Sequence, residues 1–427
     1  MFKISITAAI MLGTTVYCAV AGTTILTVGG ASGQYPTIAA AAAAADEDTD
    51  LANDYVIRVA PGTYTNDSPQ VTRPMTIEAA VPGSNVILNA SAPLANEKGI
   101  ILASASVTVD GLTLENANIS NSLGGNGAGI RDEDTRPNDV LVVRNSIFIN
   151  NQMGILTDVN IPLNTILINN LFMNNGNTNP SYWGHSIYLG SNNSSLVAIG
   201  NEICGTNIGH DIKSRAAINL IENNTLYDGA ADANQPSCNV GSASFAVDLP
   251  NGGVAVVVAN TIIRGTASQT PIMFAYGEEG LVYSTNSISF IDNTMDNTGA
   301  NVTGIYDNPS TPIPVAGNGN TFASSIATQV NPASADHLTG SISGSISADG
   351  TILTAPSGGS LMTAAGTWSF GSTQMQPGQY QIFLNGNYAS GWAAKMEVDG
   401  GGKLYAYNSG GGGWWVWNNG WAQVAGP

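Results

Sequence analysis

The chain has 427 residues, and its 12 Lys and Arg against 30 Asp and Glu give a formal net charge of −18. Such a surface repels nucleic acid and anionic lipid, so we expect neither as a partner. It also repels polyanionic sugars at long range, so a uronate substrate needs a locally basic site or a bridging cation. The length is sufficient for two domains.

Residues 1–21 are predicted to be a secretory signal peptide. Lys3 precedes an apolar run that ends in small residues, and no stop-transfer charges follow, which argues against a membrane span. We therefore expect a secreted protein without membrane insertion. Secretion permits a disulfide between Cys204 and Cys238, although two buried free thiols fit the sequence nearly as well.

The next segment predicts the capped end of a solenoid. The Ala-rich run at 39–45 predicts a short helix that covers the first coil, and the string at 55–64 alternates like a strand. The V-x-P-G-x-Y string at 59–64 and the V-D-G-L-T string at 109–113 resemble the N-terminal cap and coils of secreted pectate-lyase-like right-handed β-helix proteins. This resemblance implies a right-handed fold and leaves the activity open.

Six later segments repeat an apolar strand residue and a downstream Asn, roughly every 30 residues. The strand residues are Ile130, Ile155, Ile187, Ile212, Val247 and Ala275, and the corner residues are Asn145, Asn169, Asn201, Asn224, Asn260 and Asn293. Asn suits a corner because it tolerates the left-handed conformation and its amide bonds neighbouring coils. The pattern predicts an all-β parallel β-helix solenoid over 22–325, in which each coil buries its apolar face on the next.

The composition changes after these coils. Residues 326–360 are rich in Ser, Gly and Ala. Within them 326–340 are predicted to be a linker, and 341–427 are predicted to form a small all-β domain of Trp- and Gly-rich hairpins. This domain resembles an accessory module found at the C-terminus of secreted bacterial proteins. Trp414, Trp415 and Trp417 are candidates to stack on sugar rings, or alternatively to form the domain core.

Consecutive strand residues face opposite sides, which sorts the polar side chains into outward columns. The column directly after the strand residues contains Arg131, Leu156, Tyr188, Lys213, Asp248 and Tyr276, and the column two positions further contains Arg215 and Glu278. We expect Arg131, Tyr276 and Asp248 to bind substrate on this face. Trp183 is a further candidate for substrate binding.

Lys213 and Arg215 form a cation pair that predicts acid/base chemistry. Proton abstraction alpha to a uronate carboxylate needs a base, a neutraliser for the developing charge, and an acid for the leaving oxygen. Lys213 is the expected base, with a pKa lowered by its cationic neighbour, while Arg215 is the neutraliser and Tyr188 the acid. The alternative is that the two cations only offset the charge of the acids around them.

Carboxylates near this pair predict a calcium site. Asp211, Asp248 and Glu278 are the expected ligands of a Ca²⁺ that bridges to the substrate carboxylate. The string at 210–224 also resembles the Lys-Ser segment that carries the base in chondroitinase B-like and alginate-lyase β-helices. The resemblance extends to Lys213 alone, because the Arg of those families comes from another coil.

Two histidines occur in near-identical strings, W-G-H-S-I-Y and I-G-H-D-I-K. Strand parity places His185 and His210 in an inward column with Met153, which favours a His ladder bonded to neighbouring backbone. If the strands begin after Gly184 and Gly209 instead, both rings line the cleft and become candidates for catalysis.

The leading hypothesis is a secreted, monomeric polysaccharide lyase that cleaves a uronate-containing glycan by β-elimination. A uronate C5-epimerase shares the proton abstraction. A glycoside hydrolase needs two carboxyl groups across the groove, for which Asp211 and Asp248 are candidates. The hypothesis from another class is a non-catalytic surface protein that binds glycan.

Overall fold

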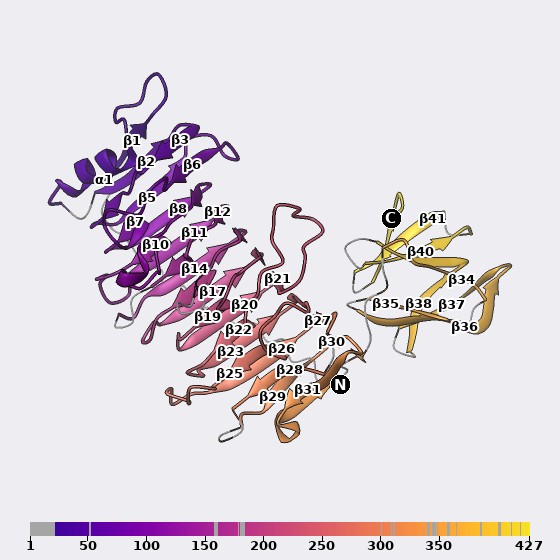
Figure 1. Ribbon diagram of the computed structural model, residues 1–427. Coiled ribbons are helices and arrows are strands. Elements are labelled where there is room, and N and C mark those ends of the chain that lie inside the picture. The colour runs from indigo at the N-terminus through magenta and orange to yellow at the C-terminus, as the bar shows by residue number, and fades with distance from the viewer. Residues whose placement is uncertain are drawn as a thin grey trace.

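The computed structural model describes residues 22–50, 53–157, 161–177, 179, 184–299, 301–308, 310, 312–339, 342–343, 347, 349–356, 359–363, 365–384, 387–399, 403–410, 412–418 and 420–427. The predicted signal peptide and Trp183 lie outside these residues. Up to Ser343 the described strands run parallel in stacked coils (Figure 1), which makes this part of the chain a parallel β-helix. Within the described part, no helix has the length and hydropathy to cross a bilayer.

The described strands of the coils form three parallel sheets, named A, B and C. Sheet A consists of β1 (Thr23–Val28), β2 (Asp54–Val59), β5 (Met75–Ala79), β8 (Val107–Asp110), β11 (Val140–Arg144), β14 (Asn164–Ile168), β17 (Ser195–Ile199), β20 (Ile218–Glu222), β23 (Val254–Val258), β26 (Ser287–Ile291), β29 (Val315–Asn318) and β32 (Asp336–Thr339). Sheet B consists of β3 (Gly62–Thr65), β6 (Val86–Asn89), β9 (Thr113–Glu115), β12 (Ile147–Ile149), β15 (Leu171–Met173), β18 (Glu202–Cys204), β21 (Thr225–Asp228), β24 (Thr261–Arg264), β27 (Thr294–Asn297), β30 (Thr321–Phe322) and β33 (Ile342–Ser343). Sheet C consists of β4 (Gln70–Val71), β7 (Gly99–Ala103), β10 (Ala128–Asp132), β13 (Met153–Leu156), β16 (Ile187–Leu189), β19 (His210–Ser214), β22 (Phe245–Leu249), β25 (Ile272–Tyr276), β28 (Val302–Asp307) and β31 (Ile326–Asn331).

The C-terminal domain is antiparallel. Sheet D consists of β34 (Ile352–Thr354), β39 (Lys395–Val398), β40 (Leu404–Asn408), β41 (Gly413–Trp417) and β42 (Trp421–Val424), and sheet E of β35 (Ser360–Thr363), β36 (Gly366–Gln376), β37 (Gln379–Leu384) and β38 (Asn387–Ala393). Strand β41 pairs with β40 and β42, as the predicted Trp-rich hairpins require. Trp368, Ile382 and Met396 are buried in a core separate from that of the coils.

A buried column of aliphatic side chains runs through sheet C, as predicted. Ile130, Ile155, Ile187, Ile212 and Val247 are paired from coil to coil, and none of them is exposed. The next member is Phe274 rather than the predicted Ala275. A slip of one residue moves every side chain of a strand to the opposite face. Tyr276 is therefore buried in the main core instead of facing outward.

A ladder of buried Asn amides joins the corners of the coils. Its rungs are Asn170, Asn201, Asn224, Asn260, Asn293 and Asn320. The four from Asn201 to Asn293 were predicted as corner residues. In each step the Asn side-chain oxygen accepts the backbone N–H of the preceding rung. Asn145 and Asn169, which were predicted as corner residues, lie one position before the bonded positions Ser146 and Asn170, in the left-handed conformation at φ 52° and 54°. The two properties that suit Asn to corners are thus divided between adjacent residues.

The predicted capping helix is α1 (Ile38–Asp46), and it packs against the first coils. Thr37 caps its N-terminus by accepting the N–H of Ala40, and the Asp67 carboxylate accepts the N–H groups of Ile38 and Ala39 at 2.6 and 2.9 Å. A carboxylate at this position satisfies otherwise unpaired donors and favours the helix dipole.

The predicted linker at 326–340 is wrong. Strand β31 pairs with β28 in sheet C, and β32 pairs with β29 in sheet A, so this segment forms a further coil. The Ser, Gly and Ala of the wider stretch 326–360 concealed the coil, because parallel pairing is made by the backbone and needs no particular side chain. Between Cys204 and Cys238 a disulfide is formed, which decides between the two states that the sequence allowed.

Candidate active-site groove

A groove of about 820 Å³ lies on the outer face of sheet C. Its lining extends from Arg131 on β10, across Tyr188 and Lys213 on β16 and β19, to Glu278 and Glu279 after β25. Lys213 follows Tyr188 in the parallel register and precedes Asp248. The structure therefore brings together Arg131, Tyr188 and Lys213 on one face, as the outward column predicts.

Strand alternation breaks at one position in sheet C, and this break decides where the histidines point. His210 pairs with Phe245 and Ile212 with Val247, and Asp211 between them is fully buried. Two consecutive side chains, at 211 and 212, thus face the interior, while the register with β22 continues without a shift. His210 and Lys213 on either side both line the groove. The favoured inward orientation of the histidines is wrong, and the alternative that places them in the cleft is correct.

His185 and His210 stack in the wall of the groove with ring centroids 4.9 Å apart, and the ring of Phe245 stacks on His210 at 5.0 Å. Burial lowers the pKa of His185 to about 3 and that of His210 well below its usual value. Both rings are therefore neutral near pH 7.

The hydrogen bonds of this pair indicate the tautomers. Nδ1 of His185 accepts the backbone N–H of His210 at 3.0 Å, and Nδ1 of His210 lies 3.2 Å from the same atom. A lone pair on His185 Nδ1 favours the proton of His210 on its own Nδ1. This assignment leaves the basic lone pair of His210 on Nε2.

Lys213 lies between two carboxylates. Its Nζ is 3.1 Å from Asp248 Oδ2 and 3.0 Å from Glu279 Oε1. Desolvation lowers the pKa of Lys213, but the two carboxylates raise it more, and the net shift is upward. The ammonium is therefore charged near neutral pH, and the predicted lowering of the Lys213 pKa is wrong. An ammonium here can instead stabilise negative charge.

Arg215 is held by several groups around it. Its Nε donates to the Tyr188 hydroxyl at 3.1 Å, and its Nη1 donates to Asn251 Oδ1 at 2.8 Å. Its Nη1 and Nη2 also meet the two oxygens of Glu279 at 2.7 and 2.8 Å. The sequence analysis missed Glu279, because this residue follows a strand in a turn bounded by glycines and lies outside the outward columns. The Glu-Glu pair between glycines was the available signal.

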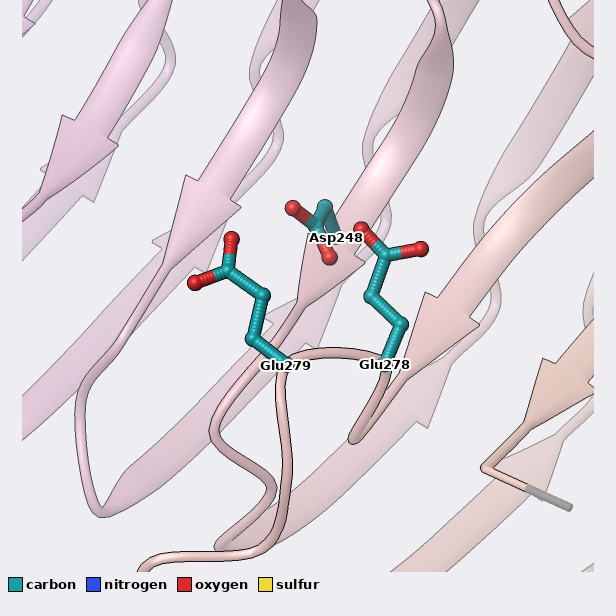
Figure 2. A group of neighbouring side chains, drawn as sticks. All are labelled: Asp248, Glu278 and Glu279. Carbon is teal, nitrogen blue, oxygen red and sulfur yellow. The ribbon is translucent and has the colours of Figure 1, made fainter. Parts of the chain in front are cut away.

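Three carboxyl groups gather at this end of the groove (Figure 2). Oxygens of Asp248, Glu278 and Glu279 lie within 4.8 Å of one another, and the two glutamates project from the loop after β25 toward the strand that carries Asp248. Burial raises the pKa of Asp248 to about 7 and also raises that of Glu278. The bond from Arg215 is the main reason that the pKa of Glu279 falls to about 2.

These oxygens have the chemistry that Ca²⁺ prefers, but a cation already contacts them. The Lys213 ammonium lies within hydrogen-bonding distance of Asp248 and Glu279. As arranged, the three carboxylates do not fit a calcium ion unless Lys213 moves. Calcium binding at Asp248 and Glu278 therefore stays a prediction from the sequence.

Asp211 and Tyr276 lie elsewhere. Asp211 faces the interior, where burial and the carboxyl group of Asp228 raise its pKa well above its usual range. It does not join Asp248 and Glu278, because of the break in alternation described above. Tyr276 lies in the core for the register reason given earlier, and its hydroxyl donates to the carbonyl of Gly253. Neither residue lines the groove.

Arg131 lies at the opposite end of the groove and is paired. Its Nη2 is 2.6 Å from Glu133 Oε1, and Lys98 Nζ is 3.0 Å from the same oxygen. Between the two ends, the floor is apolar: Ala128, Met153 and Leu156 form a cluster separate from the main core, and Tyr188 packs against it. Apolar atoms flanked by polar groups suit the CH faces of a sugar chain.

The predicted tryptophans of the C-terminal domain have different surroundings. Trp415 lines a pocket of about 200 Å³ together with Trp392 and Trp421. Trp417 packs on the domain core, and its ring centroid lies 5.2 Å from that of Trp368. Trp414 lies beside Tyr407, and the ammonium of Lys395 is 4.5 Å from its ring centroid. The core hypothesis therefore fits Trp417, and sugar binding by Trp414 and Trp415 stays a prediction.

A scan against protein-family models and a search of curated proteins both return no match. A neutral imidazole, a charged ammonium and a phenol border one groove, next to carboxyl groups whose pKa values are shifted in opposite directions. This set has the components of proton transfer at a carbon acid or at a glycosidic oxygen.

Proposed function

We propose that the groove binds a uronate-containing glycan and abstracts the proton alpha to its carboxylate, as a polysaccharide lyase or a uronate epimerase does. The observation that carries the proposal is the pairing of a neutral base with a charged cation. His210 and Lys213 are three residues apart on β19, both line the groove, and both approach Asp248 Oδ2, at 3.8 and 3.1 Å.

The roles follow from the protonation states. His210 takes the proton at C5 through Nε2, and Lys213 with Arg215 stabilises the charge that develops on the substrate carboxylate. The Tyr188 hydroxyl accepts from Arg215 Nε, so its own proton is directed elsewhere and can be donated to the leaving oxygen. In β-elimination the C4–O bond breaks, its electrons pass to the oxygen, and a C4=C5 double bond forms. In epimerisation C5 is reprotonated from the other face.

We further propose secretion and glycan binding by the C-terminal domain. A uronate polymer is repelled by a chain of net charge −18, so a second binding site helps to retain it. The pocket between Trp392, Trp415 and Trp421 supports this role, because its walls are aromatic and its volume of about 200 Å³ suits a single sugar ring. Tethered sites of this kind raise the effective concentration of a polymer.

Glycoside hydrolysis is the second candidate, and one observation favours it. Glu278 and Glu279 line the groove, and their pKa values are shifted in opposite directions, up for Glu278 by burial and down to about 2 for Glu279. A carboxyl group with a raised pKa beside an ionised one is the combination that acid-base hydrolysis uses. The pair replaces Asp211 and Asp248, since Asp211 faces the interior.

A panel of uronate and neutral polysaccharides tests these proposals. We expect uronate glycans to gain the ultraviolet absorbance of an unsaturated product, and His210→Gln to reduce the rate by about 100- to 10,000-fold. The Phe245→Leu variant, which changes the stacked neighbour without removing a base, is the matched control. Reducing ends without absorbance on neutral glycans would favour hydrolysis, and binding without any turnover would favour a non-catalytic surface protein.

A further inference from the structure

Arg215 and Lys213 have the geometry of a carboxylate receptor. The guanidinium meets both oxygens of one carboxylate, at 2.7 and 2.8 Å, and the ammonium adds a third contact at 3.0 Å. Forked contacts of this kind, each with charge on both partners, are the strong and specific way in which proteins hold a carboxylate. The carboxylate in this position belongs to the chain itself, namely to Glu279.

The receptor does not depend on Glu279 for its shape. Tyr188 and Asn251 fix the orientation of Arg215, and Asp248 holds the ammonium of Lys213 from the other side. Tyr283 adds a hydrogen bond to the carbonyl of Arg215. Only about a tenth of the Lys213 side chain and 14% of the Arg215 side chain are exposed. Removing the Glu279 carboxylate would thus leave a preformed, poorly solvated positive site.

Glu279 is placed so that it can leave. Its side chain is 43% exposed, and it belongs to the loop 277–286, outside the packed strands. Gly277 and Gly280 flank the Glu-Glu pair in the left-handed region, at φ 69° and 103°, and a Cβ at Gly280 would meet nothing within 4 Å. The backbone N–H of Glu279 donates to the carbonyl of Pro250 at 3.1 Å.

We propose that Lys213 and Arg215 are a binding site for a ligand carboxylate and that Glu279 occupies this site until such a ligand replaces it. The inference rests on the proposed function for the identity of the ligand, a uronate. Glu279 then acts as an internal competitor, so the groove accepts a carboxylate-bearing sugar only when its contacts along sheet C outweigh the contacts of Glu279. A free monouronate, which lacks those contacts, binds the unmodified protein weakly.

Removal of the internal carboxylate tests the proposal. In Glu279→Ala, added acetate should raise the melting temperature by about 2 °C or more over an equal concentration of sodium chloride, since a ligand that binds only the folded state stabilises it. Glu279→Gln should bind monomeric galacturonate at least about tenfold more tightly than the wild type does, and galactose no better. Calorimetry measures the second effect.

The matched control is the substitution of Glu278, which removes a carboxyl group from the same loop. Glu278→Ala should show no specific acetate effect, and Glu278→Gln no gain in galacturonate affinity. Equal gains at both positions, or no carboxylate effect in either Glu279 variant, would overturn the inference. Carboxylate binding by Glu279→Gln without turnover of any glycan would sink the proposed function and leave the receptor standing. Turnover by the wild type without that binding would do the reverse.

Discussion

At the scale of single residues, the buried histidines make the stability of the folded chain depend on pH. Burial lowers the pKa of His185 to about 3 in the folded chain, whereas an unfolded His has a pKa of about 6.5. Between these values the unfolded state binds the proton and the folded state does not. Falling pH therefore favours unfolding, and stability that is present above about pH 6.5 is progressively lost toward pH 3.

The His185→Phe variant should lose this pH dependence. The slope of the free energy of unfolding between about pH 6 and 4 should fall by about 1.4 kcal/mol per pH unit. The variant also removes the acceptor of the His210 N–H, which should cost about 1 kcal/mol at every pH. Denaturant unfolding across this range measures both effects, with the exposed His337→Ala as the control. A variant slope equal to that of the wild type would contradict a neutral His185.

Residue positions were predictable where they depend on register alone. Lys213 and Tyr188 follow directly from the repeated apolar column, and the structure pairs them. The protonation of Lys213 was not predictable, because Glu279 reaches it from 66 positions away in the chain. Tyr276 was placed on the wrong face because the predicted register between neighbouring coils was off by one residue.

At the scale of elements, the Asn ladder holds the corners in register. The Asn224 amide oxygen accepts from the backbone and the side chain of Asn201, each at 2.9 Å. Its amide nitrogen donates to Ala198 and to Asn260, also at 2.9 Å. Asn223, the residue before it, has φ 55° and lies in the left-handed position of the same corner. The sequence pattern located these corners but could not divide the two roles between adjacent residues.

The two neighbouring positions provide a matched test. Asn224→Ala leaves several buried groups without partners and should lower the free energy of unfolding by roughly 2–4 kcal/mol. Asn223→Ala only places a Cβ-bearing residue in the left-handed region and should cost about 1–2 kcal/mol. Chemical denaturation of the two variants gives both values. If Asn223→Ala proved the more costly, the ladder would not be the main stabilising feature of the corner.

At the scale of the whole molecule, composition and architecture diverge near the end of the β-helix. The repeat of apolar and Asn residues was enough to predict the coils, because each coil buries the same positions on the next. After the last Asn rung, strands β31 and β32 still pair with the coils, although they open the stretch 326–360, which is rich in Ser, Gly and Ala. Backbone pairing needs no particular side chain, so the sequence could not mark this boundary.

The groove on sheet C links this architecture to function, since it runs from β10 to the loop after β25 and includes His210, Lys213, Glu278 and Glu279 in its lining. The central claim is that these groups remove the proton at C5 of a uronate. The most direct test is nuclear magnetic resonance of an oligouronate incubated with the full chain in D₂O. The account predicts that the H5 signal disappears, by elimination or by exchange with deuterium, and persists with His210→Gln. Cleavage of the chain with H5 fully retained would contradict it and assign the groove to hydrolysis.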